Sequence, residues 1–186
     1  MTDPTRAQRI INEHVLWAVG AGLVPIPLVD IAAVTAIQLD MLKQLSTLYG
    51  TVYTESEGKA WVSALAGGIA ARLGANALKL IPGIGSVVGG AAMSAMSGAS
   101  TYALGQVAMT QFAAGKSFSA MDLDHAKKTY EEHLAKGKEV AAQMAKDKRE
   151  SKDVFEKLEK LRSLRDQGVI TAEDFEAQKQ RLLASV

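Results

Sequence analysis

The sequence predicts an all-α protein with an apolar body and a charged tail, and three observations lead to this fold class. Only 5% of the 186 residues are aromatic, whereas Ala, Leu, Gly and Val are abundant; an all-β sandwich favours aromatic and β-branched residues. Apolar residues recur at helical spacing, and Pro or Gly interrupts the apolar runs at defined points. These observations predict two apolar helical hairpins with Pro/Gly breaks, a long charged amphipathic helix and a C-terminal two-helix module.

Charge divides the chain into two parts. Of the 41 charged residues, 29 lie in residues 116–186, where 15 are basic and 14 are acidic. Residues 80–115 carry no charge, and residues 14–39 carry Asp30 alone. The net charge of +1 and the balanced tail predict no nucleic acid or other polyanion as a partner. The first ten residues contain no apolar core, so no cleavable signal peptide is expected.

The first apolar hairpin is interrupted by two prolines. A helix is predicted over 5–22 and ends before Pro25 and Pro27, because each proline lacks an N–H donor and pushes the preceding residue out of the helical region. The apolar pattern resumes over 28–48, and Gly50 provides a stop for this second helix.

The second apolar hairpin begins at Thr54, which has Glu57 at the spacing of a capping box. The box opens a predicted helix over about 55–80, and another helix is predicted over 86–113. A Pro-Gly-Ile-Gly sequence separates these two helices. The hinge candidates in this break are Pro82, Gly83 and Gly85.

The charged tail predicts a long helix followed by a small module. Residues 120–149 have the sparse apolar stripe of a charged amphipathic helix. A separate two-helix unit follows over 154–183, with Gly168 at the end of its first helix and Thr171 as the cap of its second. The apolar residues of this unit are oligomerisation candidates: Phe155, Leu158, Leu161, Leu164, Phe175 and Leu182.

The apolar body can be buried in lipid or in protein, and the sequence favours lipid. Residues 15–37 have the length of a membrane span, but their prolines leave two arms of about ten residues, which suit a re-entrant hairpin. Small residues at four-residue spacing in residues 80–115 would let helices approach closely, as membrane helices do. The helix-packing candidates are Gly89, Gly90, Ser94 and Gly98. The alternative is a soluble bundle that buries both hairpins against each other.

Asp30 and the break residues are the candidates for membrane insertion or hinge motion. Asp30 is either an intramembrane carboxylate or a cap of the helix after Pro27. The cap is favoured, because an anion at that point meets the positive end of the helix dipole. Arg72 and Lys79 lie seven residues apart, on one helical face, where they would reach lipid headgroups or remain solvated.

No catalytic or metal-binding constellation is predicted. The chain has no Cys, no G-x-S-x-G motif and no His beside a candidate nucleophile. The GIGSVVG segment lacks nucleotide-loop spacing and the Walker lysine, which favours a hinge. One local cluster lacks the spacing of a zinc helix and is better explained as a solvated face: Asp122, Asp124, His125 and His133. We therefore expect no enzyme, no metal and no cofactor.

Two regions resemble known families. Residues about 8–115 contain PIPLVDIAAVTAIQ and IPGIGSVVGG, and this region resembles the bacterial family called domain of unknown function 697. The resemblance implies a helical, membrane-associated domain, which some members carry fused to, or encoded beside, small GTPases. Residues about 154–183, with their leucine-bearing helix, Gly168 turn and Phe175, resemble the short C-terminal (SHOCT) domain. That second resemblance implies an oligomerisation module.

These observations predict a bacterial, self-assembling, membrane-associated scaffold without catalytic activity. Its expected parts are an apolar membrane domain (1–115), a charged linker helix (116–153) and an association module (154–186). Its expected partners are copies of itself and a lipid bilayer, at the inner membrane with a cytoplasmic tail. The alternatives are a soluble, cytoplasmic homo-oligomeric adaptor, with a small GTPase as a possible partner, and, behind it, a pore former.

Overall fold

A computed structural model describes the chain as an all-α protein, which confirms the predicted fold class. Every regular element among the described residues is helical. The described residues are 3–21, 29–67, 85–120 and 122–184. The helices, in chain order, are α1 (Pro4–Ala21), α2 (Val29–Tyr49), α3 (Glu55–Leu65), α5 (Gly85–Ala113), the short 3-10 helix η1 (Phe118–Ala120), α6 (Leu123–Asp166) and α7 (Ala172–Leu183).

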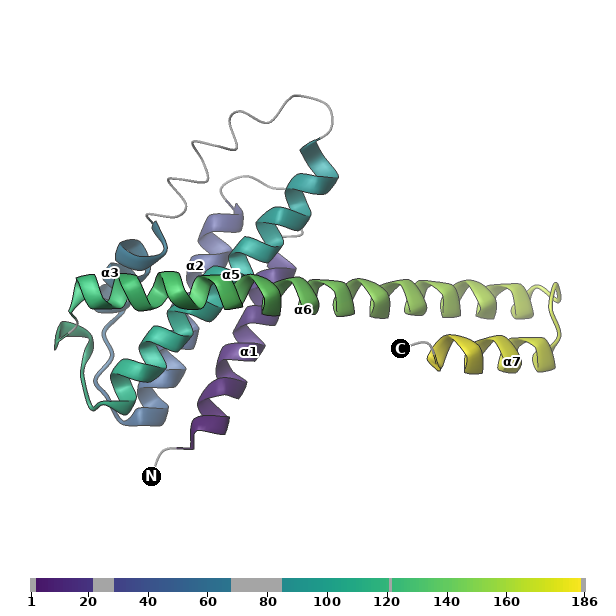
Figure 1. Cartoon of the computed structure of the whole chain (residues 1–186). Helices are drawn as coiled ribbons and strands as arrows, with labels where there is room; N and C mark the ends of the chain where they lie inside the picture. Colours follow the sequence, from purple (N-terminus) through teal and green to yellow (C-terminus); the bar gives the residue numbers. More distant parts are fainter. Residues whose placement is uncertain (1–2, 22–28, 68–84, 121, 185–186) are drawn as a thin grey trace. The chain divides into compact units, whose positions relative to one another are not determined.

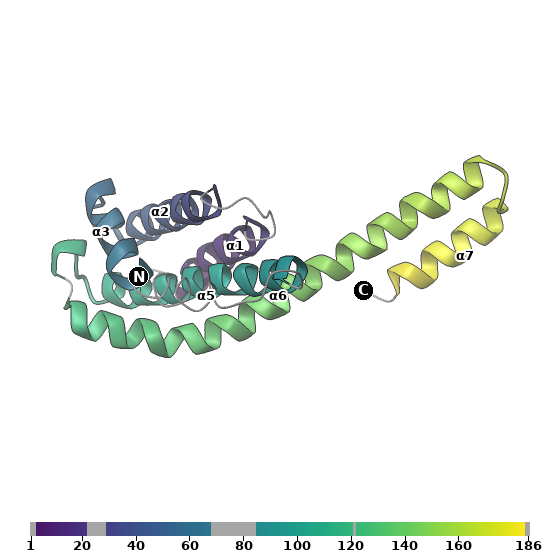
Figure 2. The ribbon, with the colours of Figure 1, turned by 90° about the horizontal axis from the view of Figure 1, so that it is seen from above.

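Helices α1, α2 and α5 lie side by side as a bundle (Figures 1 and 2). α1 runs antiparallel to α5. Near the start of α1, the Gln106 side-chain amide donates to Gln8 Oε1 at 2.8 Å. Near its end, Ser94 Oγ donates to the Val19 carbonyl oxygen at 2.6 Å. The end of α1 and the starts of α2 and α5 therefore lie at the same end of the bundle.

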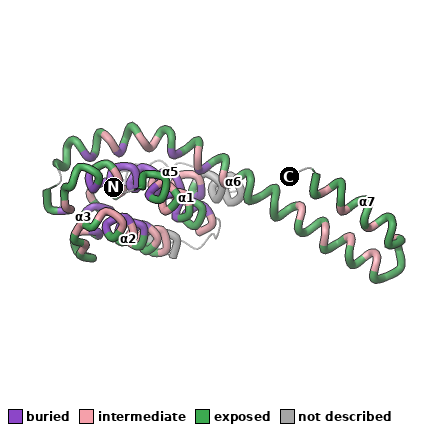
Figure 3. The backbone as a smooth tube through the Cα atoms, turned by 90° about the horizontal axis from the view of Figure 1, so that it is seen from below, coloured by how far each residue is buried: buried purple, intermediate pink, exposed green. Residues whose placement is uncertain are grey.

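The bundle has an apolar core in which Gly105 lets two helices approach closely. A Cβ added to Gly105 of α5 would lie 2.8 Å from Ile11 Cγ1 of α1, so α5 approaches α1 as closely as it does only because this position lacks a side chain. Figure 3 places the buried residues on the inner faces of these helices. The largest fully buried apolar side chains of the bundle are Ile11, Val15, Val19, Met41, Leu42, Leu45, Leu104, Val107 and Phe112.

A polar network crosses this core and reaches α6. Ser100 Oγ of α5 accepts hydrogen bonds from the Gln38 amide of α2 at 3.1 Å and from the Tyr130 hydroxyl of α6 at 2.8 Å. Burial raises the pKa of Tyr130 to about 12, so its hydroxyl remains a donor at neutral pH. The network satisfies polar groups that would otherwise be costly to bury, and it fixes α2 and α6 to the same point of α5.

Aromatic side chains attach α3 to the bundle. The Trp61 indole N–H donates to the Phe118 carbonyl oxygen at 3.1 Å, and the two rings meet edge to face with centroids 4.7 Å apart. Trp61 also stacks on Phe112 of α5, with centroids 5.9 Å apart. α3 ends at Leu65, within the predicted helix over 55–80; the continuation of that prediction beyond residue 67 lies outside the described residues.

Four of the predicted helix ends are confirmed by cap geometry. Thr54 caps α3 by accepting a hydrogen bond from the Glu57 N–H. Thr171 and Asp174 form the reciprocal capping box that opens α7. Gly50 and Gly168 have φ values of 67° and 71°, in the left-handed region that glycine adopts freely after a helix.

One helix replaces two predicted helices in the tail. The sequence predicted a helix over 120–149 and another from 154, whereas α6 runs without a break from Leu123 to Asp166. No Pro or Gly interrupts residues 138–166, and three i,i+4 ion pairs span the expected boundary. These pairs are Lys146–Glu150, Lys152–Glu156 and Lys157–Asp153.

The compact units also differ from the three predicted segments. The chain divides into Met1–Ala145 and Lys146–Val186. The first part of α6 belongs to the first unit, because it packs on the bundle instead of acting as a linker. Its buried residues are Ala126, Tyr130, Gly137 and Ala141.

Candidate association surfaces

At one end of the bundle, the adjoining parts of α1 and α5 carry no charged residue, whereas the start of α2 carries Asp30. We define this uncharged end as residues 15–21 of α1 and 93–97 of α5, which the Ser94–Val19 hydrogen bond brings together. It contains no Asp, Glu, Lys or Arg. The opposite end, formed by the start of α1 and the end of α2, presents exposed Arg and Lys side chains. Charge is therefore distributed asymmetrically along α1.

Large apolar side chains are exposed at the uncharged end. The exposed fractions are 41% for Leu16, 52% for Trp17 and 46% for Met93. A single exposed apolar side chain is ordinary on a soluble protein, whereas several at an uncharged end indicate a contact surface. Trp also combines an apolar ring with an N–H donor, which suits the boundary between lipid and water.

A buried histidine packs against Trp17. His14 is fully buried, and its ring lies 4.9 Å from the Trp17 ring between centroids. His14 Nδ1 lies 2.7 Å from the Ile10 carbonyl oxygen, and Nε2 lies 3.0 Å from Asp40 Oδ2 of α2. The pKa of Asp40 is held below its ordinary value, chiefly by the hydrogen bond from His14 and further by one from Gln44.

The sequence did not identify this polar pair. His14 and Asp40 are 26 residues apart and meet only because α1 and α2 pack against each other. A signal was available, since His14 lies between Ile11, Val15 and Ala18 on the buried face of α1. A polar side chain on such a face requires a hydrogen-bond partner from the neighbouring helix.

The predicted small-residue face lies partly within the bundle. Ser94 and Gly98 are fully buried or nearly so against α1, and a Cβ on Gly98 would lie 2.6 Å from Val19 Cγ2 and 2.7 Å from Ala141 Cβ. These contacts are made inside one chain, so a role of this face between copies stays a prediction. The packing around the other candidates, Gly89 and Gly90, lies outside what the structure describes.

The predicted hinge residues lie mostly outside the described residues. These are Pro25, Pro27, Pro82 and Gly83. Gly85 is the first residue of α5. Asp30 is the second residue of α2, in the turn where a carboxylate meets the positive end of the helix dipole, and its side chain lies outside the described part. Its assignment as a cap or as a membrane carboxylate stays a prediction.

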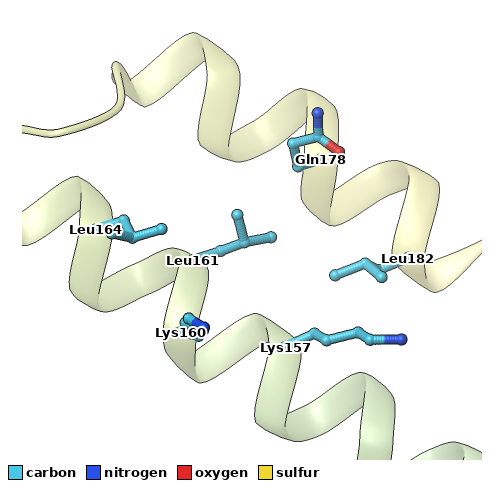
Figure 4. A pocket seen from close by; sticks show the side chains of 6 residues that line it. All are labelled: Lys157, Lys160, Leu161, Leu164, Gln178 and Leu182. Atoms are coloured by element: carbon cyan, nitrogen blue, oxygen red, sulfur yellow. The ribbon is translucent and has the colours of Figure 1, made fainter.

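The C-terminal hairpin brings the predicted oligomerisation candidates together without burying them. No described residue of the second unit is buried. A hollow of about 270 Å³ lies between α6 and α7, and Figure 4 shows Leu161, Leu164 and Leu182 directed toward it. Lys157, Lys160 and Gln178 complete its lining.

Apolar side chains on other faces of this hairpin are exposed. The exposed fractions are 63% for Phe155 and 54% for Leu183. The Arg165 guanidinium carbon lies over the ring of Phe175 of α7, 4.8 Å from the ring centroid. This is a cation–π contact. Leu158 is half-buried. A hairpin with so little burial leaves apolar surface available to another chain.

Two features are absent from the described part of the chain, a metal-binding group and a membrane-spanning helix. No group of three His, Asp or Glu side chains is arranged to hold a metal ion among these residues. Within the same residues, each helix is too short or too polar to cross a bilayer.

Comparison with known proteins establishes the family. Residues 3–139 match the model of the family described as Domain of unknown function (DUF697). The chain belongs to this family. The DUF697 region thus extends into α6, and residues 156–183 match the Short C-terminal domain (SHOCT). Both matches confirm the resemblances predicted from the sequence.

A named relative gives one further clue. The chain is 38% identical over 143 residues to "Magnetosome membrane protein 22" of Magnetospirillum gryphiswaldense, and the match covers 74% of this chain and 73% of that protein. No solved structure matches this DUF697 chain.

Proposed function

We propose that this DUF697 protein is a non-catalytic, self-assembling scaffold that attaches to a membrane through the uncharged end of its bundle. The observation that carries the proposal is the exposure of Leu16, Trp17 and Met93 on the parts of α1 and α5 that carry no charge. The name of the 38% identical relative supports a membrane location. The proposal includes the inner membrane as the site of attachment, with the C-terminal hairpin in the cytoplasm.

The proposed membrane contact is peripheral for the described part of the chain. The bundle helices bury their apolar faces against one another, and the proposed contact with lipid uses the exposed side chains of the uncharged end. Transfer of a Leu, Met or Trp side chain from water contributes about 1.5–3 kcal/mol. Two or three such side chains therefore give weak, reversible binding for one copy.

Self-assembly would strengthen this weak binding. The C-terminal hairpin has no buried residue of its own among those described, and two such hairpins would form a four-helix bundle that buries their leucines. Several copies joined in this way would bring several uncharged ends to one membrane, and linked contacts bind far more tightly than single ones.

Flotation with liposomes tests the membrane contact. We expect the full-length protein to float with vesicles of phosphatidylcholine and phosphatidylglycerol. A Leu16→Ser/Trp17→Ser variant should bind with a partition coefficient lower by more than about tenfold. Val52→Ser is the matched control, because Val52 is 74% exposed and lies outside the uncharged end. Wild-type protein that stays below the vesicles, or equal flotation of the double variant, would contradict the proposal.

A soluble homo-oligomeric adaptor is the second candidate function. It is favoured by the closed core of the bundle, in which α1, α2 and α5 already cover one another's apolar faces. Size-exclusion chromatography with light scattering, without detergent, separates the two functions. A discrete soluble oligomer that ignores vesicles supports the adaptor, whereas an oligomer that floats supports the scaffold.

A further inference from the structure

The hydrogen bonds of His14 require more protons than a neutral imidazole carries. Nδ1 lies 2.7 Å from the Ile10 carbonyl oxygen, which can only accept, so Nδ1 must carry a hydrogen. Nε2 lies 3.0 Å from Asp40 Oδ2, and an ionised carboxylate also can only accept. Both contacts are hydrogen bonds at once only if one additional proton resides on the pair.

We infer that His14 and Asp40 form a proton-binding site that joins α1 to α2 beneath Trp17. The proton gives an imidazolium that donates one N–H to Ile10 and the other to the Asp40 carboxylate. Such charge-assisted hydrogen bonds are stronger than neutral ones. The site does not require the proposed membrane contact or self-assembly, although it touches Trp17.

The surroundings of the pair favour a bound proton that can exchange. His14 is fully buried, whereas the Asp40 side chain is 51% exposed, so the proton has a path to water through the carboxylate. α5, which packs against both α1 and α2, has no charged residue. The titratable side chains near the pair in the described part of the chain include Lys43 on α2, the exposed Glu13 on α1 and Tyr53, which interacts electrostatically with Asp40 from the segment before α3.

Trp17 is coupled to this site by direct contact. Its ring is tilted by 55° against the His14 ring, with centroids 4.9 Å apart. An imidazolium at this distance from an indole gains cation–π attraction, which a neutral imidazole lacks. Proton binding therefore acts on an exposed aromatic side chain of the uncharged end as well as on the α1–α2 contact.

The direction of the pH dependence follows from the two partners. When His14 loses its proton, a ring nitrogen lone pair faces either the Ile10 carbonyl or the Asp40 carboxylate, and one hydrogen bond becomes a repulsion. The stabilisation is therefore present while the proton is bound and is lost when a rise in pH removes it. The pKa of Asp40 is lowered in the folded protein, so its contribution is lost only when the pH falls through that lowered value.

Nitrogen NMR of the full-length protein with labelled histidine tests the site directly. At pH 5.5 we expect both ring nitrogens of His14 to be protonated and to remain hydrogen-bonded. A His14 ring with one unprotonated nitrogen at that pH would overturn the inference, whatever the protein does with membranes.

Two variants and a control test its energetic role. The unfolding equilibrium constant of the wild type should be higher at pH 8.5 than at pH 6, because the proton-bound pair makes one more hydrogen bond. His14→Gln should remove this change. Asp40→Asn should also remove it, because the Asn amide donates to a neutral Nε2 and restores the contact at high pH. His125→Gln, at an exposed histidine, should keep the wild-type dependence.

The outcomes of these measurements are separable. A His14→Gln protein that keeps the wild-type pH dependence would overturn the inference. If that variant does not fold, the NMR measurement on the wild type still decides whether the proton is bound. Failure of the flotation experiment with a protonated His14 would reject the proposed function and leave the proton-binding site in place.

Discussion

Glycine residues, which have no side chain, determine how closely the helices of the first unit approach one another. A Cβ on Gly137 of α6 would lie 2.7 Å from the Ala99 carbonyl oxygen and 3.1 Å from Ala99 Cα. The atoms in the way belong to backbone, which cannot rotate aside as a long side chain can. Gly137 therefore fixes the distance between α6 and α5, in the same region where Tyr130 bonds to Ser100.

Gly137→Ala is expected to destabilise the first unit. Alanine would gain about 1 kcal/mol of helix propensity, but a clash with backbone costs about 3 kcal/mol, so the free energy of unfolding should fall by about 2 kcal/mol. Urea denaturation monitored by circular dichroism measures this change. Gly67→Ala is the control, because a Cβ there meets nothing within 4 Å. A Gly137→Ala protein as stable as the wild type would show that α6 does not pack as described.

At the scale of helices, local signals in the sequence predicted most ends but not the contacts between helices. Thr54 and Thr171 cap α3 and α7 as expected, because a cap depends on residues three positions apart. The break predicted after residue 149 was wrong, since a change of composition does not end a helix that lacks Pro and Gly. The His14–Asp40 contact depends on tertiary packing, which local patterns do not specify.

The cap of α7 is expected to control the stability of the C-terminal hairpin. Thr171 accepts a hydrogen bond from the Asp174 N–H, and the Asp174 carboxylate accepts one from the Thr171 N–H. Thr171→Ala should therefore cost about 1 kcal/mol, whereas Thr171→Ser should cost little because it keeps the hydroxyl. Amide hydrogen exchange in α7 measures the difference, with α1 as an internal reference. Equal exchange in α7 of the Ala and Ser variants would contradict this role of the cap.

For the whole molecule, the two compact units differ in burial and in charge. The first unit has a core and an uncharged end, whereas the second unit has neither a buried residue nor an uncharged surface among its described residues. We therefore propose that attachment to lipid belongs to the first unit and self-assembly to the second. α6 contributes residues to both units, because it runs without a break from Leu123 to Asp166.

The two activities should be separable by substitutions at exposed positions. Leu16→Ser/Trp17→Ser should abolish flotation and leave the oligomer mass unchanged. A double variant of the hairpin, Phe155→Ser/Leu183→Ser, should lower the mass measured by light scattering. Its single copies should still float at high lipid concentration, with weaker binding because the linked contacts are lost.

Val52→Ser is the control for both variants, because Val52 is an exposed apolar residue that lies on neither surface. All of these positions are exposed, so the helix content of each protein should match the wild type and a folding defect cannot imitate the result. If the hairpin variant keeps the wild-type mass, copies are not joined through the C-terminal unit. If it loses mass and all flotation even at high lipid concentration, one surface serves both purposes, and the division of the two activities between the two units is wrong.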